Sequence, residues 1–305
     1  MNVIKMGGYL QGALYWRAKL RTKEQRRLGR GNLSGAYFIK SLSKATGTPL
    51  SEVKRIGTYQ ILSYFSGLIR TMDALVDEVG IKPQDAAANP NYIFYRNKFI
   101  AAIDKSPLDI RKKNAIKRIF SRDEKLMINA LADAHNHGLP IAESIAHKER
   151  TAGQCFRTTT KIFLAAHGNK KGGNGGLINA MENLFMAAQM ADDLHDLHED
   201  HNVRLNMVNP ILAKFKPELE RVEASQSRAK SMRWLRRNAP RTVASAEMHM
   251  RNYLAAANRH HPEITGLIAP GFDFFLRHRR VFDAISNVDS THKRMRIDRT
   301  ELQEH

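Results

Sequence analysis

The chain has 305 residues, 42% hydrophobic and 26% charged, and this composition excludes a largely disordered protein. Its 49 lysines and arginines against 30 aspartates and glutamates give a formal net charge of +19, which favours an anionic partner. The single cysteine, Cys155, excludes an intrachain disulfide and a cysteine-rich zinc module. Glycines interrupt the first 20 residues, and no uncharged apolar run reaches the ~18 residues of a spanning helix. We therefore expect a cytoplasmic protein. Any membrane contact would be peripheral, with the basic surface on anionic lipid.

Taken in chain order, the sequence predicts helices separated by short joints. Residues 1–30 form a basic N-terminal segment, residues 31–290 an all-α domain, and residues 291–305 a polar tail. No run of alternating apolar and polar residues predicts a strand. We expect a loop over residues 81–91, which carry two prolines, and a flexible interhelical loop over the glycine-rich residues 168–176.

Acidic residues form two clusters on predicted helices. In the first, Asp73 and Asp77 lie one turn apart beside Arg70, on a different face from the apolar stripe through Leu68 and Met72. In the second, three aspartates follow one another at four-residue intervals with Gln189 on the same side: Asp192, Asp196 and Asp200. Each pair of like charges one turn apart destabilises a helix by about 0.2–0.5 kcal/mol. Such faces therefore indicate a nearby cation.

Carboxylate oxygens on one helical face suit Mg²⁺, which takes one or two protein carboxylates together with substrate phosphates. Two such faces opposed across a helical bundle would hold metal ions between them and clamp a diphosphate. Basic side chains would complete the clamp, because arginine grips phosphate with two hydrogen bonds. The candidates are Arg70, Lys148, Arg150, Arg157 and Arg204.

Two other interpretations of these clusters stay open. An acidic helix face is often merely solvated, and each cluster taken alone fits that description. His195, His198 and His201 could instead be metal ligands, although their three-residue spacing drifts around the helix.

Taken together, these motifs resemble the squalene/phytoene synthase family of the class I isoprenoid synthases. The family's R-x-x-D-x-x-x-D motif is similar to Arg70, Asp73 and Asp77, and its second aspartate motif is similar to residues 189–200, with Asp192 in place of the usual asparagine. Residues 151–153 (TAG) stand where the family has V-A-G. The sequence resembles the bacterial large terpene synthases nearly as closely as it resembles the squalene/phytoene synthase family.

The resemblance implies a single helical bundle around a central apolar cavity. It also implies Mg²⁺ as the cofactor, a prenyl diphosphate as the substrate, and a class I terpene synthase or prenyltransferase activity. The family's metal and catalytic positions fall on Asp73, Asp77, Asp192, Asp196 and Asp200. His147 or Glu149 replaces a tyrosine of the family, and the arginine run after the second motif is reduced to Arg204. These departures favour ionisation of one substrate over head-to-head condensation of two.

Two functions of other classes remain as alternatives. Arginines around Trp234 and residues 277–280 would suit a basic helical nucleic-acid-binding protein, although no nucleic-acid-binding motif is present and we expect no nucleic acid partner. A metal-dependent helical phosphohydrolase would need His135 and His137 to meet the histidines of residues 195–201.

Overall fold

The computed structural model describes residues 38–78, 80–137, 143–195, 197, 206–225 and 232–276. These residues form helices and connecting turns with no strand among them, which confirms the predicted all-α class. Within the same ranges, no helix combines the length and the apolarity that crossing a bilayer requires. The predicted terminal segments 1–30 and 291–305 lie outside the described residues.

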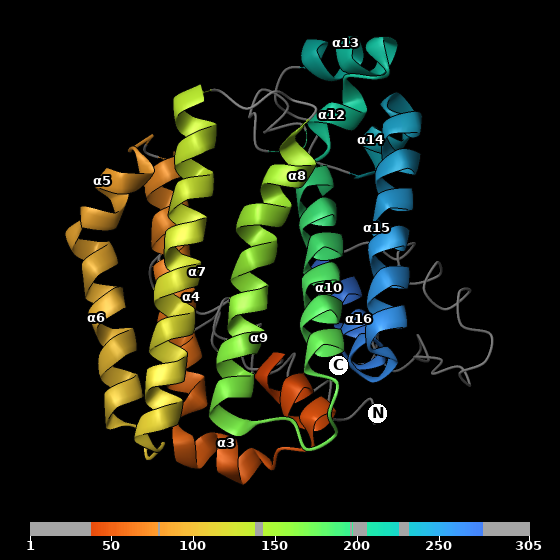
Figure 1. Ribbon diagram of the computed structural model, residues 1–305. Helices are drawn as coiled ribbons and strands as arrows, with labels where there is room; N and C mark the ends of the chain where they lie inside the picture. The colour runs from red at the N-terminus through yellow and green to blue at the C-terminus, as the bar shows by residue number, and fades with distance from the viewer. Residues whose placement is uncertain are drawn as a thin grey trace, which may run out of the picture.

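The helices are arranged as a bundle whose long members run between a lower and an upper end in Figure 1. A first helical stretch covers residues 38–46. The elements that follow are α3 (Leu50–Ile56), α4 (Thr58–Asp73), η1 (Ala74–Glu78), α5 (Pro83–Ala88), α6 (Pro90–Lys105), α7 (Ile110–His137), α8 (Ser144–Lys148), η3 (Glu149–Gly153), α9 (Gln154–His167), α10 (Asn174–His195), α12 (Asn209–Leu212), α13 (Lys216–Ala224), α14 (Met232–Asn238), α15 (Pro240–His260) and α16 (Pro262–Leu276).

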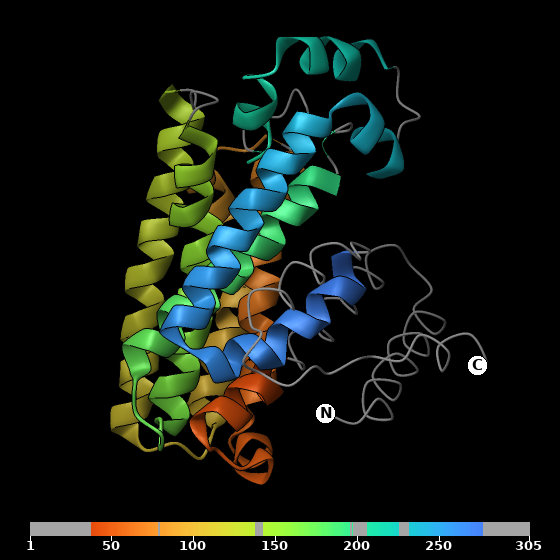
Figure 2. The ribbon, with the colours of Figure 1, turned by 90° about the vertical axis from the view of Figure 1, so that its right-hand side faces the viewer.

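Neighbouring helices pack through one continuous hydrophobic core. α4 packs on α6, α7 packs on α9, and α10 packs on α9, α15 and α16. Figure 2 shows α15 running obliquely across α10. Phe65, Phe99 and Phe120 bring α4, α6 and α7 together, with ring centroids 4.7–6.2 Å apart. α4 and α6 approach closely at Gly67, where a Cβ would lie 2.6 Å from the ring of Tyr95.

Two predicted connections have different outcomes. The glycine-rich segment does connect two helices, α9 and α10, with residues 168–173 outside both. The expected loop over residues 81–91 is wrong, because α5 occupies Pro83–Ala88 and α6 begins at Pro90. Each proline stands at the first turn of its helix, where its missing N–H has no helical partner to lose, and three alanines continue α5.

Two π-helical turns interrupt the regular helices. η1 continues α4 directly, and η3 joins α8 to α9. π-Helical turns are rare and occur frequently at functional sites. Both turns carry residues that the sequence analysis singled out, Asp77 in η1 and Arg150 in η3. Both also lie toward the upper end of the bundle in Figure 1, where α4 and α10 end.

Candidate functional site

The first acidic cluster lies at the end of α4. Asp73 is the last residue of this helix and is exposed, whereas Met72 and Val76 on either side of it are buried. Asp73 has neither a hydrogen bond nor an ion pair within the described ranges. Arg70, one turn earlier, is also exposed. The backbone of Asp77 belongs to η1, but its side chain lies outside what the structure describes.

The second acidic cluster lies near the end of α10. Asp192 is exposed, whereas the buried side chains of Met190 and Leu194 form the predicted apolar stripe. The remaining predicted ligands of this cluster lie outside the described side chains: Asp196, Asp200 and Arg204. The histidines of the zinc and phosphohydrolase interpretations, His195, His198 and His201, and His135 and His137, do so as well.

Asp193, next to Asp192, has a structural role that the sequence did not reveal. It is buried, and its carboxylate accepts hydrogen bonds from Gln189 Nε2 at 2.6 Å and from the backbone N–H of Met207 at 2.7 Å. Its backbone carbonyl accepts from Asn206 Nδ2 at 2.8 Å. Gln189 therefore binds Asp193, although the sequence analysis placed it with Asp192. Asp193 fixes the chain that follows α10 and leaves Asp192 as the exposed carboxylate.

Electrostatics make the exposed position of Asp192 unfavourable for a carboxylate. The C-terminal end of a helix carries a partial negative charge of its carbonyl groups, and a nearby acidic side chain typically costs about 0.3–1 kcal/mol. Asp192 stands near the end of α10, whereas η1 continues the helical backbone beyond Asp73. Neither position contributes to the core, since both side chains are exposed. A bound cation would relieve the repulsion at Asp192.

The segment between these two helices supplies basic residues. Lys148 ends α8 and is half-buried, and Arg150 in η3 is exposed. His147 beside them is buried, and among the described residues its Nδ1 has no hydrogen-bond partner. Burial lowers the pKa of His147 to about 4, and the charges of Lys148 and Arg150 act in the same direction. The imidazole is therefore neutral at pH 7.

Residues from three elements converge around Cys155 at the start of α9. Burial raises the pKa of the Cys155 thiol to about 12, the negative charge of Asp73 on α4 adds to the rise, and Lys148 on α8 opposes it. The thiol contacts Met127 Sδ on α7 at 3.2 Å. Asp73 and Lys148 are therefore both close enough to Cys155 for their charges to affect the pKa of its thiol, although they lie 75 residues apart in the chain.

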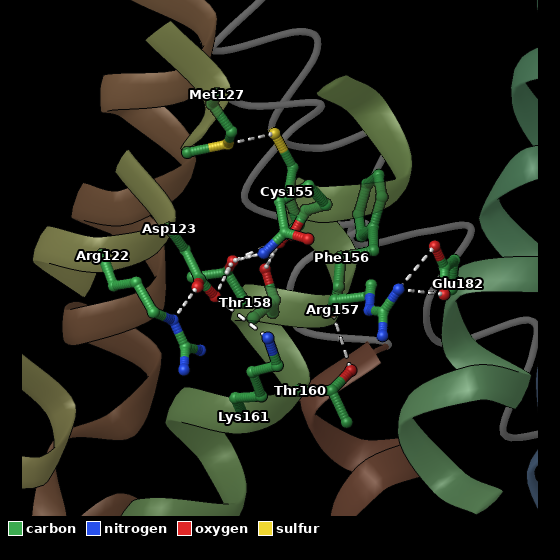
Figure 3. A network of polar contacts seen from close by, with 12 residues as sticks. Arg122, Asp123, Met127, Cys155, Phe156, Arg157, Thr158, Thr160, Lys161 and Glu182 are labelled. Carbon is green, nitrogen blue, oxygen red and sulfur yellow. Dashed lines mark hydrogen bonds and ion pairs between the residues drawn. The ribbon is translucent and has the colours of Figure 1, made fainter. Parts of the chain in front are cut away.

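Arg157 is the predicted phosphate ligand with the weakest structural support. Its guanidinium forms an ion pair with Glu182 on α10, with Nη1 and Oε2 3.3 Å apart, as Figure 3 shows. Glu182 precedes Asp192 by ten residues, which is about 15 Å along the helix axis. Arg157 thus points to the middle of α10 rather than to its acidic end. On the same side of α9, Tyr253 of α15 donates to Glu149 Oε1 at 2.9 Å.

The structure also contains a polar network that the sequence analysis missed. Asp123 of α7 is buried, and its carboxylate accepts hydrogen bonds from Thr158 Oγ1 at 2.7 Å, Lys161 Nζ at 3.2 Å and Arg122 Nε at 2.8 Å (Figure 3). Burial alone would raise the pKa of Asp123, but these three donors hold it below its ordinary value. The network joins α7 to α9, and we call it the seam between these two helices. Its partners lie 35 and 38 residues apart in the sequence, so local spacing carried no signal of it.

Glu124 extends this seam toward α6. It accepts hydrogen bonds from Tyr92 Oη at 2.9 Å and from Arg96 Nε at 3.0 Å. Burial raises the pKa of Tyr92, and the charge of Glu124 raises it further. Asp123 and Glu124 are thus fully used as structural carboxylates.

Aromatic side chains lie between α9, α10 and the first helical stretch. Phe156 and Phe185 stack on each other, and Phe38 packs against Phe185 with ring centroids 4.5 Å apart. All three are partly exposed, whereas Phe65 and Phe163 are ordinary core residues. One surface hollow of the described part is lined by Lys44 with residues 260–263 and 266–267, and another by α7 residues between Arg111 and Ser121. The central cavity stays a prediction.

No group of three or more histidine, cysteine, aspartate or glutamate side chains suited to a metal occurs among the described residues. No family model matches the chain, and no curated protein matches it. It is similar to the solved structure of a geranylgeranyl pyrophosphate synthetase from the archaeon Geoglobus acetivorans, with 14% identity and a TM-score of 0.56. The similarity covers 90% of this chain and 97% of the other. The chain therefore has the all-α fold of the isoprenoid synthase type.

Proposed function

We propose that this protein is a magnesium-dependent isoprenoid synthase that ionises a prenyl diphosphate at the upper end of the bundle. One observation supports the proposal: the exposed carboxylates of α4 and α10 and the basic residues of α8 and η3 all lie toward this end. Asp73 and Lys148 both act on Cys155, and Asp192 is exposed near the end of α10. The isoprenoid synthase fold of the chain supports the same substrate class.

The available donors fit Mg²⁺. Asp73 is exposed and has no hydrogen bond or ion pair within the described ranges, so its carboxylate oxygens are accessible to a hard cation. Asp192 is exposed as well, although it has an interaction of its own. From the spacing of the two sequence motifs we assign Asp77, Asp196 and Asp200 to the same two ligand sets. Bound Mg²⁺ would supply the positive charge that stabilises a departing diphosphate.

The chain's own basic residues would hold the substrate. Lys148, Arg150 and Arg70 would donate hydrogen bonds to diphosphate oxygens, and the two arginines could each bind two oxygens at once. Phe156 and Phe185 would form an apolar wall that keeps water from the allylic carbon after the diphosphate leaves. We exclude Arg157 from the phosphate ligands because Glu182 already pairs with it.

We further propose that one substrate is ionised per cycle, so that the cation cyclises, loses a proton or captures water. His147 supports this choice, since a buried neutral imidazole adds no charge to bind a second diphosphate. Condensation of two prenyl chains remains the competing outcome, because residues 70–77 match the condensing family closely.

The test is incubation of the full chain with Mg²⁺ and C5 to C20 prenyl diphosphates, singly and in pairs, followed by mass analysis of apolar products. A product with the carbon number of one substrate supports the single-substrate proposal. A product of doubled or extended carbon number contradicts it and supports condensation.

Asp73→Asn should reduce turnover at least a thousandfold, about 4 kcal/mol of barrier, because it removes a charged metal ligand from the reaction. Asp104→Asn is the matched control. Asp104 is an exposed aspartate near the C-terminal end of α6, and its carboxylate pairs with Lys117 at the surface. Equal rates in both variants and the unaltered chain would overturn the proposed function.

A further inference from the structure

The first half of α7 carries an unusually dense set of basic residues on its outer side. Residues 110–125 include seven lysines and arginines in sixteen positions, whereas the whole chain has 49 in 305. The only acidic residues in this stretch, Asp123 and Glu124, are buried and fully bonded within the bundle. The exposed side of this half-helix therefore carries an excess of positive charge.

Three of these residues form a stripe at intervals of seven. Arg111, Arg118 and Lys125 are exposed and make no hydrogen bond or ion pair within the described ranges. Seven residues are nearly two helical turns, so the three side chains point the same way and follow one another at about 10 Å along the axis. Arg111 and Arg118 also line a surface hollow together with Asn114 and Ser121. We call these three residues the α7 stripe.

The other basic residues of the segment are engaged. Lys117 pairs with Asp104, Lys113 Nζ donates to the carbonyl of Asp104 at 2.8 Å, and Lys112 Nζ donates to the carbonyl of Ala166 at 3.1 Å. Arg122 is tied to Asp123. The α7 stripe is thus the part of the charge left available to a partner.

Exposed apolar side chains occur on the same helix and on α6, and at about 100° per residue Ile110 and Leu126 flank the stripe on its two sides. The described residues contain five large exposed hydrophobic side chains, and four of them belong to α6 and α7: Ile93, Phe94, Ile110 and Leu126. Ile110 directly precedes Arg111 and is 68% exposed, and Leu126 directly follows Lys125 and is 51% exposed. Lys98 lies over the ring of Phe94 at 5.4 Å.

Basic residues flanked by exposed aliphatic ones favour a lipid surface over nucleic acid. Phosphate contacts alone would account for the stripe, but a nucleic acid offers nothing to Ile110 and Leu126, whereas a bilayer accepts them between its headgroups. We propose that the outer side of α7 docks peripherally on an anionic bilayer, with the α7 stripe on lipid phosphates and the two aliphatic residues at the headgroup boundary. This inference does not depend on the proposed enzymatic function.

The experiment is co-sedimentation of the full chain with large vesicles of phosphatidylcholine, with and without about 30% phosphatidylserine. Binding is expected only with the anionic lipid and should weaken as salt rises. The variant Arg111→Gln/Arg118→Gln/Lys125→Gln should bind about a hundredfold more weakly, because each basic residue near such a surface contributes about fivefold.

The control removes the same charge from another face: Arg241→Gln/Arg251→Gln/Arg259→Gln on α15, whose side chains are exposed. In Figure 1, α15 lies on the opposite side of the bundle from α7. This variant should bind like the unaltered chain. If both triple variants weaken binding equally, net charge rather than the α7 stripe drives it, and the proposal fails.

A second variant separates a bilayer from nucleic acid. Ile110→Ser/Leu126→Ser should weaken vesicle binding severalfold at constant charge, because it removes the apolar insertion. The proposal is overturned if this variant binds vesicles normally while the stripe variant loses affinity for a short RNA or DNA duplex. Absence of binding to anionic vesicles by the unaltered chain overturns it as well. Circular dichroism of every variant excludes misfolding as the cause.

Discussion

The seam between α7 and α9 and the acidic end of α4 and α10 use carboxylates in opposite ways. In the seam, Asp123 is buried and accepts three side-chain hydrogen bonds. At the acidic end, Asp73 is exposed and has no partner within the described ranges. A carboxylate whose hydrogen bonds are formed within the fold has a structural role, whereas an exposed carboxylate without such partners is accessible to a ligand.

Two adjacent residues differ in burial in the same way. Asp193 is buried and binds Gln189 and the backbone of Met207, whereas Asp192 is exposed to solvent. One residue of rotation, about 100° around the helix, therefore separates a structural carboxylate from a candidate metal ligand. An acidic sequence motif can thus contain both kinds of carboxylate, and their burial distinguishes them.

The comparison predicts its largest effect on stability at the seam. Asp123→Asn should lower the free energy of unfolding by about 3 kcal/mol, because Thr158, Lys161 and Arg122 lose the charged acceptor of their hydrogen bonds. Asp73→Asn should change it by less than about 0.5 kcal/mol. Urea denaturation followed by circular dichroism measures both. Equal losses in the two variants would remove the distinction between the two regions.

A titration tests the buried histidine near the acidic end. The pKa of His147 is about 4 in the folded protein and near its ordinary value when unfolded, so the unfolded state binds more protons between these values. Stability should therefore fall as the pH decreases through this window, by roughly 3 kcal/mol at pH 4, and this loss should be absent in His147→Gln. The readout is the difference between the two unfolding free energies, measured from pH 7 to pH 4. Parallel pH curves would show that His147 is not buried as a neutral group.

A smaller effect tests how far the seam extends. Tyr92→Phe removes the hydroxyl that donates to Glu124 and keeps the ring in the core, so it should cost about 2 kcal/mol, as hydrogen bonds to charged groups do. Tyr64→Phe serves as the control, because the Tyr64 hydroxyl has only a weak exposed contact with Gln60 at 3.4 Å. Thermal unfolding of both variants decides the point. A loss no larger in Tyr92→Phe than in the control would confine the seam to α7 and α9.

The sequence predicted the helical class and the separation of faces, because both depend on local periodicity. Met72 and Val76 are buried and Asp73 is exposed, as the spacing requires. It could not predict the seam. Asp123 and Glu124 occur in a run of charged residues that is typical of a solvated face, and only partners from other helices make them buried. For the same reason, the adjacent Asp192 and Asp193 were indistinguishable before Met207 and Gln189 were seen to bind one of them.

The smallest expected effect is the most direct test of the open carboxylates. If the acidic end holds Mg²⁺ and the unfolded chain does not, the ion must stabilise the fold in proportion to its binding, by about 1.4 kcal/mol at tenfold excess over the dissociation constant. Asp73→Asn should lose most of this gain, because it removes one charged oxygen ligand, and Asp123→Asn should keep it despite its lower stability. The measurement is the melting temperature with and without Mg²⁺ at constant ionic strength. Because the chain has a net charge of +19, the ionic strength is held constant so that salt screening of charge repulsion is the same in both samples. A magnesium effect that survives in Asp73→Asn would mean that the ion binds elsewhere. In that case the exposed carboxylate of α4 would be only a solvated one.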